Sequence, residues 1–572
     1  MLRTIRRREL AAVEGDWSSM PPLLQRIHAA RGATSPQHAQ PRLAQLLPPD
    51  SMGGLDAATV LLADAIAHDR HIVVVGDFDC DGATACAVGV RGLRMLGARR
   101  VSHAVPNRII HGYGLSPGLV DDLAGLQPDL LVTVDHGIAC HAGIAAAKAR
   151  GWQVLVTDHH LPGDTLPPAD AIVDPNLRGD AFPSKMLAGV GVMFYVLLAL
   201  RRHLRANGML GGGEPDLSVL LDLVAVGTVA DLVPLDANNR ALVGAGLRRL
   251  RAGQGCAGLR ALIEASGRDA RTLTAADIGF GLAPRINAAG RLEDMALGIE
   301  CLVSDDFGQA RAIASALNEI NAERRAVQQQ MTDEAEIALA RVALDGNAIA
   351  AALCLFDPEW HPGVVGLVAS KIKERVHRPV IAFAPAEPGS EMLRGSARSI
   401  PGLHIRDALA SVDAANPGLL GKFGGHAMAA GLSLSLPDLP RFEQALREQV
   451  ESMLDPSLLQ AEILSDGPLQ THEFDRASAE ALRDGGPWGQ GYPEPLFDGD
   501  FEVLNWRVVG ERHLKLELAQ AGKRLNAIEF GGWGGEPPPA RIRIAYRLEA
   551  DDYRGGDHVQ LVVMHREPAP RP

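Results

Sequence analysis

Three aspartates at alternate positions follow a run of valines in the stretch VVVGDFDCDGATACAV, residues 73–88. They are Asp77, Asp79 and Asp81. Carboxylates this close repel one another, so a fold that buries them needs a positive charge among them. The stretch therefore predicts a bound cation.

Two further apolar runs also end in acid or histidine. The candidate strand LLVTV at 130–134 is followed by the sequence DHG from Asp135, and VLVT at 154–157 is followed by DHH, whose histidines are His159 and His160. Ligands of open α/β sheets bind outside the carboxyl ends of the strands. We expect the three segments to deliver metal-type ligands to one edge of a sheet.

The chemistry of these ligands indicates the kind of ion. The expected ligands are carboxylates and an imidazole from His159 or His160, and they suit Mn²⁺ or Mg²⁺ better than ions that prefer thiolates. The carboxylates are those of Asp77, Asp79, Asp81 and Asp135. Asp231 in LLDLVAVGTVADLVPL offers a further acid, whereas Asp222, inside the same amphipathic run, is a rival with a favoured structural role. Six ligands exceed the needs of one ion and predict two divalent ions about 3.5–4 Å apart, the arrangement that clamps the attacking and leaving oxygens of a phosphoryl displacement.

The elements that must position this site alternate between strands and helices. From His71 to Asp231, short β-branched runs alternate with alanine-rich helical stretches, which is typical of a parallel sheet covered by helices. Residues 305–345 lack proline and have helical spacing, so they predict a long connecting helix. We therefore expect an α/β multidomain protein, with boundaries at 1–45 (N-terminal segment), 46–304 (parallel-sheet domain), 305–345 (helix), 346–455 (second α/β domain) and 456–572 (a small β-barrel).

Composition limits the class of protein. With 47% hydrophobic and 22% charged residues the chain of 572 residues is typical of a folded protein of several domains. The longest apolar run, 190–200, is shorter than the roughly 20 residues of a membrane helix, and no signal peptide is evident, so we expect a cytoplasmic protein without membrane contact. Six scattered cysteines predict free thiols rather than disulfides or a thiolate zinc site. The formal net charge of −13 does not exclude nucleic acid, because net charge averages over surfaces.

Several motifs resemble a known family. The sequences GDFDCDG, TVDHG, TDHH and VGTVAD resemble the successive motifs of the DHH phosphoesterase superfamily. Within it, GLAPRINAAGRL, WHPGVVGLVASKI, GSARS, GGHAMAAG and GPWGQGYPEPLF resemble the RecJ family, the single-strand-specific 5′→3′ DNA exonucleases of bacteria. The resemblance runs from about residue 46 to the C-terminal barrel.

The resemblance implies a fold and a set of site residues. The fold is a DHH domain, a connecting helix, a DHHA1 domain and an OB-fold. Metal binding is implied for Asp77, Asp79, Asp81, Asp135, His159 and Asp231, and a catalytic role for Asp135, His159 and His160. His160 is either a weak ligand or a donor to the scissile phosphate. Pyrophosphatases of the superfamily have histidine where this chain has Asp77, which favours the RecJ branch.

Substrate-binding candidates surround this core. Arg108 in PNRIIHGYG and Arg285, Asn287 and Arg291 in APRINAAGR can hold phosphates, although surface salt bridges are the alternative. In the second α/β domain, the terminal phosphate or nucleotide has candidate partners in His361, Arg398, Gly424, Gly425 and His426. For His361 the alternative is an exposed loop histidine.

The barrel and the N-terminal segment complete the prediction. Basic and aromatic residues suit a groove for single-stranded nucleic acid: Trp506, Arg507, Lys515, Lys523, Arg524 and Trp533. Trp506 is equally compatible with a place in the barrel core. Residues 1–45 have no assigned role, and their arginines either contact DNA or solvate the surface.

We therefore predict a monomeric two-metal exonuclease that hydrolyses single-stranded DNA from the 5′ end to 5′-mononucleotides, in DNA repair and recombination. The resemblance implies a helicase and a single-strand-binding protein as partners. One alternative is a DHH oligoribonuclease or cyclic-dinucleotide phosphodiesterase, and such relatives usually lack the added barrel. The other is a non-catalytic DHH scaffold for replication proteins, which should have lost ligands that this chain retains.

Overall fold

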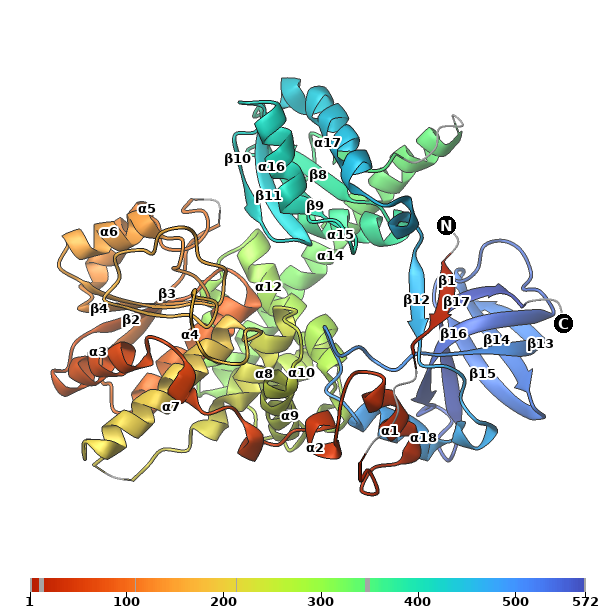
Figure 1. Cartoon of the computed structure of the whole chain (residues 1–572), viewed down its shortest axis with the longest axis horizontal. Coiled ribbons are helices and arrows are strands. Elements are labelled where there is room, and N and C mark those ends of the chain that lie inside the picture. Colours follow the sequence, from red (N-terminus) through yellow and green to blue (C-terminus); the bar gives the residue numbers. More distant parts are fainter. Residues whose placement is uncertain (1–2, 10–14, 109, 212, 345–349, 570–572) are drawn as a thin grey trace. The chain divides into compact units, whose positions relative to one another are not determined.

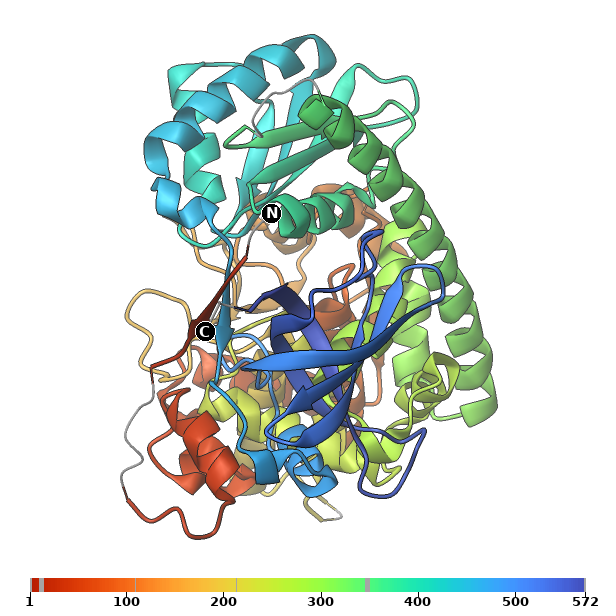
Figure 2. The same ribbon diagram turned by 90° about the vertical axis from the view of Figure 1, so that its right-hand side faces the viewer.

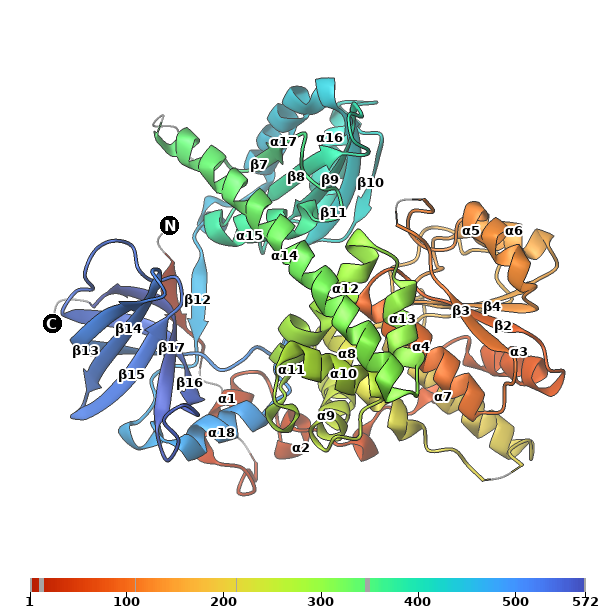
Figure 3. The same ribbon diagram turned by 180° about the vertical axis from the view of Figure 1, so that it is seen from behind.

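The computed structural model describes residues 3–9, 15–108, 110–211, 213–344 and 350–569. The chain forms two compact units, one of Arg7–Asn321 with Ser465–Pro572 and the other of Met1–Arg6 with Ala322–Leu464. Helix α14 (Phe307–Leu344) begins in the first unit and ends in the second (Figure 3). At the N-terminus, β1 (Thr4–Arg7) pairs with β12 (Glu462–Ser465).

A five-stranded parallel sheet organises the first unit, in the order β3-β2-β4-β5-β6. Its strands are β2 (Ile72–Val75), β3 (Val101–Ala104), β4 (Leu130–Val134), β5 (Gln153–Thr157) and β6 (Ala171–Val173). Every residue of β2 and β4 is buried. Strands covered on both faces need continuous apolar runs, which explains the valine-rich segments of the sequence.

Helices cover both faces of this sheet (Figure 1). Val73 and Val75 point into a core with α5 (Pro117–Leu123) and α6 (His141–Ala149). Ile72 and Val74 point the other way, into the larger core with α3 (Leu55–Ala67), α4 (Cys80–Met95) and α7 (Gly189–Ala206). The alternation of side chains along each strand therefore builds two layers of helices around one sheet.

The strand order places a topological switch point at β2. The chain leaves β2 through α4 to reach β3 on one side, and returns through α5 to β4 on the other. The register aligns Val75 with Thr133 and Val134 with Thr157, so the strands end at the same edge. A crevice outside the carboxyl ends at such a point is where ligands bind in this class of fold.

Helices from the middle of the chain pack beside this sheet: α8 (Leu221–Ala230), α9 (Ala237–Arg251), α10 (Ala257–Ser266), α11 (Ala275–Asp277), α12 (Ala283–Leu292) and α13 (Ala296–Val303). A π-helical turn, Ile278–Leu282, leads directly into α12. Their apolar residues join the same core as α4 and α7.

The first unit ends in a closed barrel of strand order β13-β14-β15-β17-β16 (Figure 2). The strands are β13 (Phe497–Val509), β14 (His513–Gln520), β15 (Lys523–Glu529), β16 (Arg541–Ala550) and β17 (Val559–Pro568). In β14 buried and half-buried residues alternate, as closure around a core requires. The N-terminal helices α1 (Pro22–Ala29) and α2 (Pro36–Ala39) and helix α18 (Arg476–Asp484) also belong to this unit.

The second unit is a mixed α/β domain with the sheet order β10-β11-β9-β8-β7. Its strands are β7 (Leu353–Phe356), β8 (Val380–Pro385), β9 (Met392–Arg398), β10 (Lys422–Gly425) and β11 (Ala429–Ser435). Its helices are α15 (Val365–Val376), α16 (Ile405–Ala415) and α17 (Leu439–Met453). The predicted fold class, with a parallel-sheet domain, a long helix, a second α/β domain and a terminal barrel, is confirmed.

Candidate metal centre

The loop between β2 and α4 carries the first three carboxylates. Asp79 is the N-cap of α4, and its carboxylate accepts a hydrogen bond from the Gly82 amide at 3.0 Å. The side-chain oxygen of Asn287, on α12, accepts a second one from the Cys80 amide at 2.7 Å. Two of the free amides of the first turn are thus satisfied, which fixes the loop that presents Asp77 and Asp79.

Asp81 lies at the N-termini of two helices. It belongs to the first turn of α4, and its two oxygens accept hydrogen bonds from the amides of Gly189 (2.6 Å) and Val190 (3.0 Å) at the start of α7. Both helix dipoles favour a negative charge there. Asp81 therefore couples the position of α7 to the acidic loop.

Asp135 follows β4 in a left-handed backbone conformation with φ of 64°. Aspartate tolerates this region better than most residues, and such conformations concentrate at functional sites. The conformation is held by hydrogen bonds from the Asp135 amide to the Thr157 carbonyl (3.0 Å) and from the Tyr113 hydroxyl to the Asp135 carbonyl (3.2 Å). Oδ1 of Asp135 lies 3.1 Å from Nε2 of His159, which in turn lies 3.6 Å from Oδ2 of Asp231.

The predicted metal-site residues converge in three overlapping groups, in each of which ligand atoms lie within 4.8 Å of one another. The groups are Asp77, Asp79 and Asp135; Asp81, His159 and Asp231; and Asp135, His159 and His160. All six predicted ligands and His160 are therefore brought together at the carboxyl edge of the sheet.

The electrostatics of the cluster fit divalent cations. Burial, and then repulsion from neighbouring carboxylates, raises the pKa values of Asp77 and Asp135 well above the ordinary value, and that of Asp81 to about 7. Oδ1 of Asp77 and Oδ1 of Asp135 are buried and accept no hydrogen bond from the described residues. Buried oxygens normally have a partner, so these two are suited to metal coordination. Carboxylates and imidazole favour Mn²⁺ or Mg²⁺.

Asp158 is a functional candidate that sequence reasoning missed. Its buried carboxylate accepts hydrogen bonds from the amide of Ile138 at 2.9 Å and from Nδ1 of His160 at 2.7 Å. Burial alone would lower the pKa of His160, but the hydrogen bond and charge of Asp158 outweigh it and raise the pKa to about 9. Asp158 therefore holds His160 as an imidazolium. The first position of the DHH sequence was available as a signal, but only the geometry shows its use.

Tyr113 and His136 were also missed. The Tyr113 ring stands edge-on to Phe78 and to His160, with centroids 5.9 and 6.1 Å away. His136, directly after Asp135, is fully buried, and its Nε2 donates to the Val75 carbonyl at 3.1 Å. Burial lowers the pKa of His136 to about 4, so it is a neutral brace between β4 and β2.

The rival acid Asp222 has a structural role. It is fully buried in the first turn of α8 and accepts a hydrogen bond from the Cys256 amide at 2.6 Å, just before α10. This agrees with the structural alternative in the sequence analysis.

Glycines allow helices to approach the cluster closely. A Cβ on Gly189 would lie 2.5 Å from Cβ of Asp135, and one on Gly227 would lie 2.8 Å from Oδ1 of Asp81. A Cβ on Gly290, on α12, would lie 2.0 Å from the Phe78 carbonyl oxygen. Helices α7, α8 and α12 therefore surround the acidic loop at distances that only glycine permits.

The substrate candidates of this unit lie in different surroundings. The Arg108 guanidinium stacks over the Phe78 ring at 4.0 Å and is close enough to Asp77 to lower its pKa in part. Arg285 is largely buried, and its Nε donates to Asn318 on α14 at 3.0 Å, so it links α12 to the long helix. Asn287 caps α4, and Arg291 lies in the last turn of α12.

The candidates of the second unit come from β9, from β10 and the residue after it, and from the loop before α15; Arg398 lies on β9. Its guanidinium donates to the hydroxyls of Ser370 (3.2 Å) and Ser396 (2.8 Å), and among the described residues no carboxylate pairs with it. Burial lowers its pKa. Arg398 pairs across the sheet with Ala429 on β11, and Gly424 and Gly425 lie on β10, the next strand beyond β11, with His426 directly after it. His361 accepts a hydrogen bond from the Gly363 amide at 3.1 Å, shortly before α15. A half-buried guanidinium without an acid partner among the described residues is suited to an anion.

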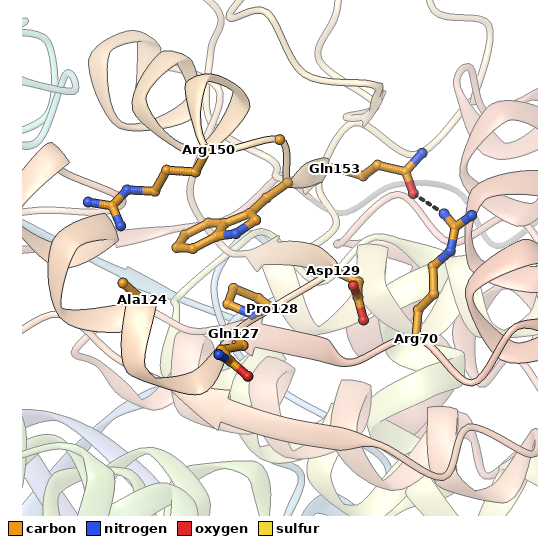
Figure 4. Close-up of a pocket in the computed structure, with 9 residues that line it drawn as sticks. Arg70, Ala124, Gln127, Pro128, Asp129, Arg150 and Gln153 are labelled. Atoms are coloured by element: carbon orange, nitrogen blue, oxygen red, sulfur yellow. Dashed lines mark hydrogen bonds between the residues drawn. The ribbon is translucent and has the colours of Figure 1, made fainter.

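A cavity of about 740 Å³ lies at the opposite edge of the parallel sheet (Figure 4). It is lined by residues that precede β2, β4 and β5, including Arg70, Asp129, Arg150 and Trp152. Arg70 is paired with Asp64 and Gln153, and Arg150 with Asp121. The cavity contains none of the predicted site residues.

Three family models match the chain in succession. The DHH family N-terminal domain matches residues 71–228, the DHHA1 domain 345–452 and the RecJ OB domain 465–565. These matches define a protein of the DHH and DHHA1 type with an added OB domain.

Whole-chain comparisons agree with these matches. The chain is 49% identical over 570 residues to the single-stranded-DNA-specific exonuclease RecJ of Salmonella typhimurium, covering 98% of each chain, and 48% identical over 567 residues to that of Escherichia coli, again covering 98% of each. A crystal structure of RecJ in complex with Mn²⁺ from Thermus thermophilus superposes with a TM-score of 0.81 at 31% identity, covering all of this chain and 80% of that one. The chain belongs to the RecJ family, which confirms the resemblance drawn from its motifs.

Proposed function

We propose that the protein is a metal-dependent exonuclease that hydrolyses single-stranded DNA from the 5′ end and releases 5′-mononucleotides. The observation that carries the proposal is the convergence of five aspartates and two histidines at one sheet edge, in groups with ligand atoms within 4.8 Å of one another. The RecJ relatives match 98% of the chain and are named single-stranded-DNA-specific exonucleases, which supports single-stranded DNA as the substrate.

The residues of the centre have two roles, metal coordination and hydrogen-bond donation. Asp77, Asp79, Asp81, Asp135, His159 and Asp231 would hold two divalent ions, Mn²⁺ or Mg²⁺. Such ions activate the attacking water and neutralise charge on the leaving oxygen.

His160 would be the donor of the centre. Its imidazolium, oriented by Asp158, would donate a hydrogen bond to a non-bridging oxygen of the scissile phosphate. The hydrogen bond to Asp158 leaves Nε2 of His160 as the atom that faces Tyr113 and the metal ligands.

Phosphate binding outside the metal centre would use cationic groups of both units. In the first unit, Arg108 and Arg291 would contact the DNA backbone, while Arg285 and Asn287 would act by fixing α12 and α4. In the second unit, Arg398 would take a DNA phosphate, because this half-buried guanidinium lacks an acid partner among the described residues. His361, Gly424, Gly425 and His426 would contact the same strand of DNA.

The barrel would hold the single strand by stacking. Trp506 and Trp533 stack with centroids 5.4 Å apart, and Trp506 is 37% exposed, so it is not a core residue. Arg507 lies on β13 beside Trp506, Lys515 on β14, and Lys523 and Arg524 on β15. An exposed aromatic ring beside cations binds bases without reading their sequence.

We also propose a cellular setting that suits the proposed substrate. No helix among the described residues is long and apolar enough to cross a membrane. We place the protein in the cytoplasm as a monomer acting in DNA repair and recombination, with a helicase and a single-strand-binding protein as partners, since unwound and loaded ends are what such an enzyme consumes. The six cysteines, all free, agree with a reducing compartment.

The test uses a single-stranded oligodeoxynucleotide labelled at either end, with Mn²⁺, with Mg²⁺ and with chelator. Immediate release of labelled mononucleotide from the 5′-labelled strand, but not from the 3′-labelled one, supports the proposal. Cleavage of only very short RNA oligomers or cyclic dinucleotides would favour the oligoribonuclease alternative. No metal-dependent hydrolysis would favour the scaffold.

A further inference from the structure

A buried stack of rings lies between the N-terminal segment and the residues that lead into the barrel. His28, on α1, is fully buried against Trp488 and Tyr492, with ring centroids 5.1 and 5.8 Å away. Its Nδ1 is hydrogen-bonded to the Tyr492 hydroxyl at 2.6 Å. Trp488 and Tyr492 also stack on each other, with centroids 5.6 Å apart and planes 11° apart.

Two arginines cover the ends of this stack. The Arg31 guanidinium lies over Trp488 at 5.3 Å, and that of Arg240 lies over Tyr492 at 3.9 Å. Cations over the faces of aromatic rings are attracted by the ring quadrupole, and more strongly where water is excluded. Arg240 belongs to α9 of the catalytic part, so the stack joins three segments that are far apart in the sequence.

Hydrogen bonds and ion pairs strengthen the same junction. Arg31 is bidentate to Asp466 at 2.8 and 2.9 Å, with both side chains buried. Arg26 is bidentate to Glu473 at 3.0 and 2.9 Å. Arg240 donates to the His38 carbonyl at 2.6 Å, which ties the N-terminal segment back to the catalytic part. The segment therefore contacts both sides of the junction.

We infer that residues 17–40 are a latch that fixes the barrel against the parallel-sheet domain, with His28 as its central positioning residue. The inference rests on the proposed function, because the role of the latch is to hold two DNA-binding surfaces, the metal centre and the barrel, at a fixed separation. A strand bound at both surfaces gains affinity through the effective concentration of the second one, which falls when the barrel is free to move. The latch also gives a role to Trp488 and Tyr492 of the GPWGQGYPEPLF motif.

The test compares long and short substrates. His28→Ala removes the stack and the hydrogen bond, and Tyr492→Phe removes only the hydrogen bond. His472→Ala, at an exposed position near the same junction, is the control. We expect His28→Ala to raise KM for a 60-nucleotide strand about tenfold with kcat unchanged, and to leave trinucleotide hydrolysis unchanged, because only a long strand reaches both surfaces. Tyr492→Phe should give a smaller rise in KM, and the control none.

Hydrogen exchange tests the latch without relying on activity. We expect faster exchange in α1 and at residues 486–493 of His28→Ala, with wild-type exchange in β2, β4 and α4. An unchanged KM for the long strand, or an equal loss on both substrates, would overturn the inference. If the wild-type enzyme did not degrade single-stranded DNA, the proposed function would fail, whereas the exchange result would still decide whether the latch exists.

Discussion

The close approach of α7 to the acidic cluster leads to a sharp prediction for Gly189. This glycine is the first residue of α7, and its amide donates to Asp81. A Cβ at this position would lie 2.5 Å from Cβ of Asp135 and 2.7 Å from both its Cα and its Oδ1. Ordinary carbon contacts are about 3.5–4.0 Å, so Gly189→Ala creates an overlap of about 1 Å.

Neither partner can move freely to relieve this overlap. The Asp135 backbone is held in its left-handed conformation by hydrogen bonds at both its amide and its carbonyl. Helix α7 must therefore shift, which weakens the bond from the Gly189 amide to Asp81. Overpacking costs about 1–3 kcal/mol, and a hydrogen bond to a charged group contributes about 1.5–3 kcal/mol. These costs fall on folding. Because a shift of α7 also displaces Asp81 and Asp135, which would hold the ions, we expect about a tenfold loss of Mn²⁺ affinity, equivalent to about 1.4 kcal/mol.

Gly191→Ala is the matched control on the same helix. Its Cβ would meet only the flexible Leu187 side chain, at 3.2 Å, and alanine improves helix propensity by about 1 kcal/mol. Isothermal titration with Mn²⁺ and thermal unfolding of both variants would check the prediction. The reasoning is refuted if Gly189→Ala binds Mn²⁺ as tightly as Gly191→Ala does.

Three further predictions concern the same centre. In metal-free protein, Asp158→Asn should return the pKa of His160 from about 9 towards 6.5 in a histidine NMR titration. A raised folded-state pKa stabilises the protein below pH 6.5, and this stabilisation is lost as the pH rises through 9. Asp158→Asn should therefore be about 3 kcal/mol more destabilising at pH 6 than at pH 10. Equal losses of unfolding free energy at the two pH values would contradict this prediction. Asn287→Ala should cost about 1 kcal/mol in urea unfolding, since it removes the acceptor for the Cys80 amide; an unchanged midpoint would count against the cap. Chelation should lower the unfolding temperature of wild-type protein, because Mn²⁺ at 100 times its Kd stabilises the folded state by about 2.7 kcal/mol; an Asp77→Asn variant should respond less, and a response equal to wild type would contradict this.

The sequence was sufficient to predict the sheet edge. The short, continuous apolar runs of β2 and β4 are typical of strands covered on both faces, and the acids that follow parallel strands meet at their carboxyl ends. The cluster that includes Asp77, Asp135 and His159 follows from this topology.

Other features depend on contacts between segments that no local pattern reports. The role of Asp158 depends on the hydrogen bond that it accepts from His160. Asp81 accepts a hydrogen bond from an amide of α7, more than a hundred residues later in the sequence. The N-terminal segment had no motif of its own. The contacts of His28 with Trp488 and Tyr492 could not be predicted, because these residues are far from it in the sequence.

Two bound ions and hydrolysis can be measured together, by counting bound Mn²⁺ with electron paramagnetic resonance while following the hydrolysis of 5′-labelled single-stranded DNA. We compare wild type with Asp135→Asn, which keeps the side-chain volume but removes a charge from two of the three ligand groups. We expect two spin-coupled ions and mononucleotide release for wild type, and at most one ion without release for the variant. Two ions and undiminished hydrolysis in Asp135→Asn would contradict it.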